Sequence, residues 1–218
     1  VRADSEGTTP GEIVGRYHEE FLDNWKKLAI SWDLYTSTGT ENHAKVTHDV
    51  FTKLFEKGHI DRRSSEQFYD EDAGRFLPDR YIEGVCPHCE YSEARGDQCE
   101  NCGRTLDPEE LINPVSKISG SEPTLRETEH FYLRLSDFQE PLSEWLSGRE
   151  GWRNHVLNFS KGWIEEGLHD RAITRDLDWG VEVPIDGIGE DKKIYVWFEA
   201  VIGYLSASKE WSKNNGSE

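Results

Sequence analysis

The chain contains four cysteines, and all of them fall within the seventeen residues from Cys86 to Cys102. Their spacing is C-x2-C-x9-C-x2-C, with Cys86 and Cys89 as one pair and Cys99 and Cys102 as the other. A two-residue gap lets both thiolates of a pair point at a common centre from a tight turn, and the second pair completes a tetrahedron. Zn²⁺ prefers such a set of four soft ligands. We therefore predict one structural zinc ion per chain, because a closed four-thiolate shell leaves no position open for water or substrate.

Two other interpretations of these cysteines stay open. The pattern is also compatible with disulfides or unrelated thiols, and iron in a rubredoxin-like site accepts four thiolates as well. The metal interpretation is favoured because the chain has no other cysteine, and because acidic residues and an Arg-Gly-Asp turn separate the pairs. Cysteines used in this way are typical of a reducing compartment, so the predicted location is the cytoplasm.

The net charge of −18, from 43 acidic and 25 basic residues, restricts the possible partners. Such a field repels phosphate backbones over most of the surface and argues against a self-contained nucleic-acid binder. No apolar run approaches the ~18 residues of a membrane span, and no signal segment opens the chain. We therefore expect no membrane partner.

The length of 218 residues suits one large domain, or one domain that carries an insertion. Val1 is not an initiator residue, and the chain contains no methionine. The opening residues 1–8 have no apolar pattern of their own, and the tail 213–218 is polar. We interpret the sequence as an internal fragment of a larger protein.

The first sixty residues have the pattern of an α/β layer architecture. Thr9 to Glu12 reads as a capping box with proline at the first helical position, and a stripe of apolar residues follows it at helical spacing. An extended piece is predicted at 31–35. A second helix is predicted over 41–57, with Gly58 as its stop.

The middle of the chain, from Asp61 to about Ile173, has shorter elements and denser turns. We interpret it as a small α+β insertion that carries the metal unit. Its predicted strands are 76–85, 115–118 and 130–135, and its predicted helices are 138–146, 152–164 and a short one capped at Asp107.

The last third returns to the α/β pattern. Ile194 to Phe198 is a near-continuous apolar run, which predicts a strand buried on both faces of a parallel sheet. A loop and helix are expected over 199–205, and open α/β sheets bind ligands where a strand passes into a helix. Trp197 and Tyr204 are therefore candidate ligand contacts, although packing alone explains these residues equally well.

Several runs of the chain resemble methionyl-tRNA synthetases. They are RFLPDRYIEGVCP from Arg75, ARGDQC from Ala94, ITRDLDWG from Ile173, YVWFEAVIGY from Tyr195, and the opening segment from Glu6 to His18. The resemblance covers nearly the whole chain, and the motifs keep the family's order. It implies part of a Rossmann-type class I synthetase catalytic domain over 1–60 and 174–218. An inserted connective-peptide domain over 61–173 would carry the zinc knuckle at 86–102.

The resemblance also implies which residues bind methionine. In the family, the Tyr-Val-Trp segment and the helix after it form part of the methionine side-chain pocket. This assigns the pocket wall to Trp197, Ala200, Val201 and Tyr204, and aromatic rings suit a thioether. The family usually has aspartate where this chain has Glu199, which leaves the role of that carboxylate open. Arg175 is expected either to contact substrate or to pin the insertion to the catalytic domain.

The enzymes of this family activate methionine with ATP and transfer it to tRNA(Met). The His-x-Gly-His and Lys-Met-Ser-Lys-Ser signatures that serve ATP in the family are absent from these 218 residues. We therefore predict no catalytic residue and no ATP-binding residue here. The fragment alone is expected to be inactive and not to bind tRNA. Two alternatives remain: a class I synthetase for another amino acid, and a zinc-ribbon module that binds proteins.

Overall fold

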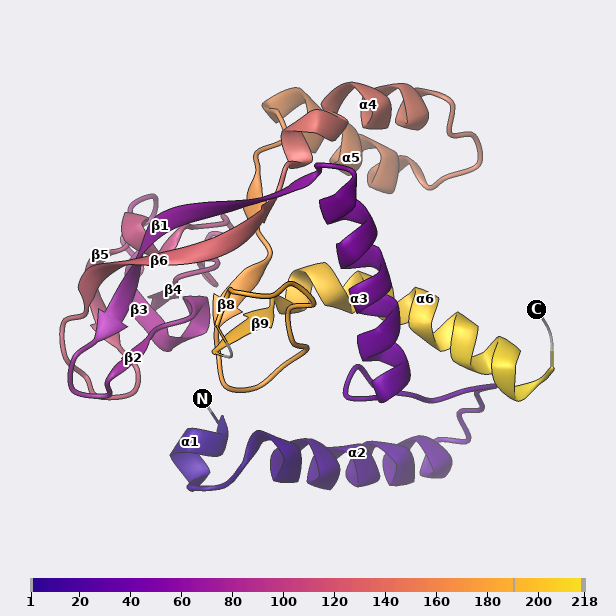
Figure 1. Ribbon diagram of the computed structural model, residues 1–218, viewed down its shortest axis with the longest axis horizontal. Coiled ribbons are helices and arrows are strands. Elements are labelled where there is room, and N and C mark those ends of the chain that lie inside the picture. Colours follow the sequence, from indigo (N-terminus) through magenta and orange to yellow (C-terminus); the bar gives the residue numbers. More distant parts are fainter. Residues whose placement is uncertain (1, 190, 217–218) are drawn as a thin grey trace.

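A computed structural model describes residues 2–189 and 191–216 of the chain (Figure 1). The helices are α1 (Arg2–Glu6), α2 (Pro10–Lys27), α3 (Glu41–Glu56), α4 (Gln139–Ser147), α5 (Asn154–Glu166) and α6 (Val196–Asn214). The longer strands are β1 (Ile60–Asp70), β3 (Ile82–Val85), β5 (Ile112–Ser116) and β6 (Thr124–Leu133). The shorter strands are β2 (Arg75–Phe76), β4 (Ala94–Arg95), β7 (Arg171–Ala172), β8 (Thr174–Asp176) and β9 (Lys192–Ile194).

Helix α2 begins with the predicted capping box. The Thr9 hydroxyl accepts a hydrogen bond from the Glu12 backbone N–H at 3.3 Å, and the Glu12 carboxylate accepts one from the Thr9 N–H at 3.0 Å. The predicted extended piece, 31–35, forms no strand, but it folds back on the helix. There Tyr35 stacks on His18, with ring centroids 4.9 Å apart. Aromatic contacts therefore take the place of sheet hydrogen bonds in this segment.

Helix α3 is the central helix of the fold and ends close to the predicted boundary. Gly58 follows it with a φ of 76°, a conformation that glycine adopts without strain. Val46 and Phe51 are buried on its inner face, and Leu54 and Phe55 are half-buried. The inner face packs against α6, which crosses α3 in Figure 1.

A long antiparallel ribbon of β1 and β6 joins the two halves of the molecule. Its register runs from the Ile60–Leu133 pair at one end to the Tyr69–Thr124 pair at the other. The ribbon contributes to two separate cores. One contains Phe51, Ile60, Phe131, Ile173, Ile188 and Ile194. The other surrounds the cysteines and contains Phe68, Leu77, Ile82, Cys86, Ala94, Cys99, Leu106 and Leu111.

The predicted strand at 76–85 is interrupted in the structure. Residues 79–81 form a 3₁₀ turn between β2 and β3, because Pro78 lacks the N–H that a strand ladder requires. The Arg-Gly-Asp turn packs against this 3₁₀ turn. Gly96 donates its N–H to the Asp79 carbonyl at 3.0 Å, and a Cβ at Gly96 would lie 2.6 Å from that oxygen. The close approach therefore requires glycine.

The prediction of a buried parallel strand at 194–198 is wrong. Strand β9 ends at Ile194 and pairs antiparallel with β8, and Val196 already begins α6. An apolar run of this length fits a helix as well as a strand, because its periodicity cannot be read over so few residues. In the helix, Phe198 faces the core while Trp197 is exposed. Among the described residues every strand pair is antiparallel.

Helices α4 and α5 form a hairpin beyond the end of the ribbon (Figure 1). Their positions match the two predicted helices to within two residues. The large apolar side chains of α5, however, are largely open to solvent, with Phe159 and Trp163 exposed. In the part of the chain that the structure describes, none of the helices is long and apolar enough to cross a membrane.

Candidate metal centre and the cleft beside it

The four cysteines converge at one point of the structure. Their Sγ atoms all lie within 4.8 Å of one another. The Cys86–Cys102 Sγ separation is 3.9 Å, and the Cys89–Cys99 separation is 3.6 Å. Four sulfurs at ~2.3 Å from a tetrahedral zinc ion lie about 3.8 Å apart, so the donor set fits this ion. All four residues are free thiols, which excludes the disulfide interpretation for this structure.

The two cysteine pairs are held by turns of the same construction. The Glu90 N–H donates to the Cys86 carbonyl at 3.0 Å, and the Gly103 N–H donates to the Cys99 carbonyl at 2.8 Å. The residue after each pair has a positive φ, 60° at Glu90 and 73° at Gly103. This repeated turn aims both thiols of a pair to the same side, as the two-residue spacing predicted.

Nearby N–H groups donate hydrogen bonds to two of the four sulfurs. The His88 backbone N–H donates to Cys86 Sγ at 3.4 Å, and the Asn101 amide donates to Cys89 Sγ at 3.6 Å. The Asn101 contact is the largest of those that lower the pKa of the Cys89 thiol, to about 6. Donors of this kind stabilise the thiolate, which is the form that binds a metal.

The predicted pocket residues Trp197, Ala200, Val201 and Tyr204 share one face of α6. Their spacing of three, four and seven residues places them on adjacent turns of the same side. Trp197 is 62% exposed and Tyr204 is 81% exposed, while Ala200 is half-buried. The face is therefore an open apolar surface on the described part of the chain.

The segment from Cys86 to Leu106, which carries the four cysteines, is called the metal-binding unit below. A cleft of about 990 Å³ lies between this unit and the beginning of α6. Trp197 and Val201 line it from the helix, and Asp97 lines it from the metal-binding unit. Ala200 and Tyr204 lie outside the cleft. The structure thus brings two of the four predicted pocket residues to the cleft and leaves the other two on the open part of the same face.

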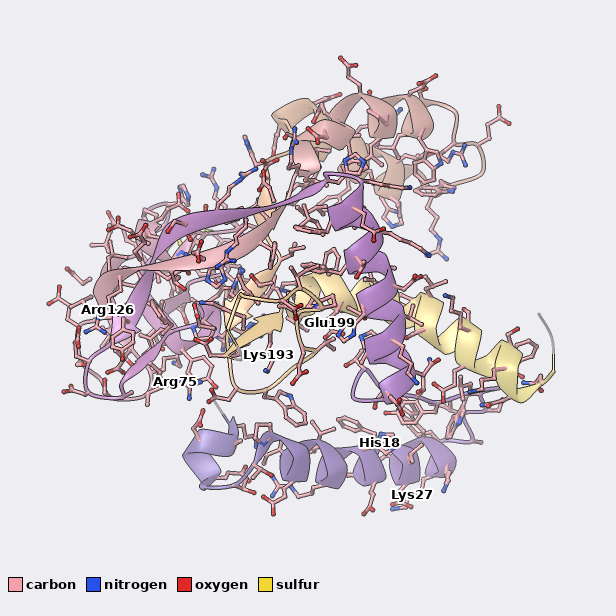
Figure 2. All side chains as sticks on the ribbon, viewed as in Figure 1. His18, Lys27, Arg75, Arg126, Lys193 and Glu199 are labelled. Carbon is pink, nitrogen blue, oxygen red and sulfur yellow. The ribbon has the colours of Figure 1, made fainter. Side chains whose placement is uncertain are left out.

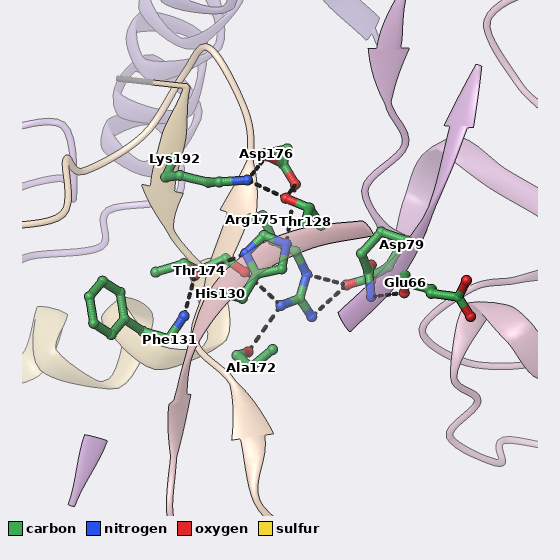
Figure 3. Close-up of polar contacts among 11 residues, drawn as sticks. Glu66, Asp79, Thr128, His130, Phe131, Ala172, Thr174, Arg175, Asp176 and Lys192 are labelled. Atoms are coloured by element: carbon green, nitrogen blue, oxygen red, sulfur yellow. Dashed lines mark hydrogen bonds and ion pairs between the residues drawn. The ribbon is translucent and has the colours of Figure 1, made fainter. Parts of the chain in front are cut away.

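Arg175 ties the two walls of the cleft together (Figure 3). Its Nε and Nη2 atoms donate to Asp79 Oδ2 at 3.3 and 3.2 Å, and Nη1 donates to the carbonyls of Ala172 and Thr174. The guanidinium also lies over the Tyr195 ring, 3.8 Å from its centroid. Asp79 begins the 3₁₀ turn that supports the metal-binding unit, and Tyr195 immediately precedes α6. These contacts agree with the interpretation that Arg175 pins the insertion.

A second polar cluster lies beneath the cleft, and no local pattern in the sequence predicts it. Lys192 forms an ion pair with Asp176 and donates to Thr128 at 2.5 Å. His130 contacts Asp176 at 3.1 Å and Thr174 at 3.0 Å (Figure 3). Burial opposes ionisation of Asp176, but its contacts with His130 and Lys192 outweigh this effect and lower its pKa. Burial lowers the pKa of His130.

The Arg175–Asp79 pair predicts a measurable stability difference. Asp79→Ala should destabilise the protein by about 3–5 kcal/mol, because it leaves a largely buried guanidinium without its carboxylate. The matched control is Asp49→Ala, which removes an exposed i,i+4 partner of Lys53 and should cost only about 0.3–0.5 kcal/mol. Urea denaturation midpoints of the two variants test this. Equal losses of stability would show that the pair does not pin the insertion.

Comparison with known proteins gives matches over nearly the whole chain. A family model described as tRNA synthetases class I (M) matches residues 1–218. A methionine–tRNA ligase of Dehalococcoides mccartyi is 55% identical over 216 residues, which cover 99% of this chain and 39% of that protein. A methionine–tRNA ligase of Cutibacterium acnes is 53% identical over 218 residues, which cover 99% of this chain and 36% of that protein. The chain therefore spans well under half the length of these relatives.

Solved structures support the fold. The structure of Mycobacterium tuberculosis methionyl-tRNA synthetase in complex with methionyl-adenylate matches 94% of this chain and 35% of its own length. Its TM-score is 0.64, at 21% sequence identity. A second structure of that enzyme, bound by methionyl-adenylate, gives a TM-score of 0.58. These matches confirm the predicted α/β class I synthetase fold, although the described strands are antiparallel.

Proposed function

This chain belongs to the tRNA synthetases class I (M) family, and on that premise we propose that it forms part of a methionine–tRNA ligase. The whole enzyme would activate methionine with ATP and transfer it to tRNA(Met), in the cytoplasm. The observation that carries this proposal is the 55% identity to a methionine–tRNA ligase over 99% of the chain. The activity belongs to the whole protein, because these residues span 39% of that relative.

In this proposal the exposed face of α6 binds the methionine side chain. Trp197, Ala200, Val201 and Tyr204 would surround the thioether, and sulfur–aromatic contacts contribute ~0.3–1.5 kcal/mol each. Their common position on one open apolar face supports the assignment. The apolar contacts would also exclude water from the substrate. We assign no proton transfer to a residue of this chain.

The four cysteines would hold a structural zinc ion. The Sγ separations and the N–H donors near Cys86 and Cys89 support this assignment. When bound, zinc would cross-link the two turns without taking part in the chemistry, because four thiolates complete its coordination. We also propose that residues 1–60 and 174–218 belong to the catalytic domain and that residues 61–173 form an insertion in it.

Methionine-dependent exchange of pyrophosphate into ATP tests this function on the whole protein. We expect exchange with methionine, and a kcat/KM roughly 2- to 10-fold lower with norleucine, which replaces the sulfur by a methylene. Preferential exchange with another amino acid would instead identify a different class I synthetase. Absence of exchange with any amino acid would favour a protein-binding zinc module.

A further inference from the structure

Helix α6 has a second face, which the pocket assignment does not use. Glu199 lies between Trp197 and Ala200 in the sequence, but it points to the opposite side, toward α3. It is buried, and Figure 2 shows it where α3 and α6 cross. A buried carboxylate requires a partner, because an unpaired one is costly to keep out of water.

The partner of Glu199 is His43 on α3, which is 1% exposed. His43 Nε2 forms a short contact with the Glu199 carboxylate, and Nδ1 lies 2.9 Å from Ser206 Oγ. Thr47 Oγ1 lies 3.3 Å from the same Nε2. One imidazole ring therefore contacts α6 at two points, in its first turn at Glu199 and two turns further on at Ser206.

The remaining contacts between the two helices do not fix the rotation of the first turn of α6. The rings of Phe51 and Phe198 meet at 6.0 Å, and apolar contacts of this kind are non-directional. The Asn42 amide donates to the Ser206 carbonyl at 2.9 Å, but this bond lies two turns away. Of the polar contacts between α3 and α6 described above, the His43–Glu199 contact is thus the one nearest Trp197 along the helix.

We propose that His43 and Glu199 are positioning residues for methionine recognition, because their contact sets the rotation of α6 and hence the direction of Trp197 and Val201. The inference rests on the proposed function of the pocket face. It also gives the extra methylene of Glu199 a role, since the longer side chain reaches His43. Loss of the contact would let the first turn of α6 rotate, and a 1 Å displacement of a binding group can cost ~10²-fold in rate.

Two substitutions of His43 separate its contact with Glu199 from its contact with Ser206. Gln places its amide nitrogen near the Nε2 position, so His43→Gln keeps a donor for Glu199 and loses the contact with Ser206. Asn places its amide near the Nδ1 position, so His43→Asn keeps Ser206 and loses Glu199. Glu199→Asp is a further variant, because it withdraws the carboxylate from His43 while retaining the charge.

Pyrophosphate exchange by the whole protein provides the test. We expect His43→Asn and Glu199→Asp to raise the KM for methionine about tenfold or more, with the KM for ATP unchanged. His43→Gln should keep a KM for methionine close to that of the parent. Should His43→Asn fail to fold, the comparison of Glu199→Asp with His43→Gln carries the test.

The control for a general loss of stability is Asp70→Asn. Asp70 is a fully buried carboxylate at the end of β1 that accepts from Ser116 and Ser119, remote from α6. The Asp70→Asn substitution should leave the KM for methionine unchanged. Equal KM values for the Asn and Gln variants of His43, or an equal rise in Asp70→Asn, would overturn the inference while leaving the proposed function intact. Absence of exchange by the parent protein would overturn both.

Discussion

Loss of the metal is expected to unfold the segment from Cys86 to Leu106 while the β1/β6 ribbon stays folded. Two cysteines, Cys86 and Cys99, are themselves core residues of this unit, so its apolar core is small. Metal binding and local folding are coupled in such units, and structural zinc contributes about 10–16 kcal/mol of apparent free energy in isolated zinc-finger peptides. The holoprotein should contain one zinc ion per chain, and Cys99→Ser should lose most of it.

Metal analysis and amide hydrogen exchange together test this expectation. In Cys99→Ser, amides of the 86–106 segment should exchange rapidly, whereas those that pair β1 with β6 should remain protected. The matched control is His88→Ala, which alters one of the two residues between Cys86 and Cys89 but removes no thiolate. Its zinc content should stay at one ion per chain. Full zinc content in Cys99→Ser, or iron in the parent protein, would contradict the assignment.

The features that the sequence predicted well are those that depend on neighbouring residues. The capping box of α2, the glycine stop of α3 and the two cysteine turns each depend on contacts within five residues. Such contacts are specified by local chemistry, so the spacing of Thr9 and Glu12, or of Cys86 and Cys89, is enough to predict them.

The features that the sequence did not predict depend on partners far apart in the chain. His43 and Glu199 are 156 residues apart, and Arg175 and Asp79 are 96 apart. Nothing in the local pattern around Glu199 indicates that a histidine on another helix will reach it. The same limit explains the error at 194–198, where the antiparallel pairing of β8 with β9 ends the strand and starts α6 earlier than the apolar run suggests.

The two pairs have complementary effects on the candidate site. Arg175 connects the metal-binding unit to Tyr195, the residue before α6, and His43 holds the first turn of that helix from the other side. The exposed pocket face is therefore anchored at the start of α6 by two largely buried polar contacts, Arg175–Asp79 and His43–Glu199. An open apolar surface needs such support, because apolar contacts alone do not specify an orientation.

Trp197→Ala in the whole protein is expected to lower kcat/KM for methionine roughly 10- to 150-fold, with the KM for ATP unchanged. The indole would supply one large apolar wall to the methionine side chain, and such a contact contributes about 1.5–3 kcal/mol. Trp197 is 62% exposed, so its removal leaves no internal cavity. The loss of stability should be well below the ~3–5 kcal/mol that truncation of a buried tryptophan costs.

The matched control for this variant is Trp211→Ala. Trp211 is an exposed tryptophan of the same helix, beyond the pocket face, so its truncation removes a comparable side chain without touching methionine. Pyrophosphate exchange should be normal in Trp211→Ala and impaired in Trp197→Ala, at equal folded fractions by circular dichroism. An equal loss of methionine and ATP binding in folded Trp197→Ala would instead assign this tryptophan to packing, because a residue that contacts only the amino-acid side chain leaves the nucleotide site unchanged.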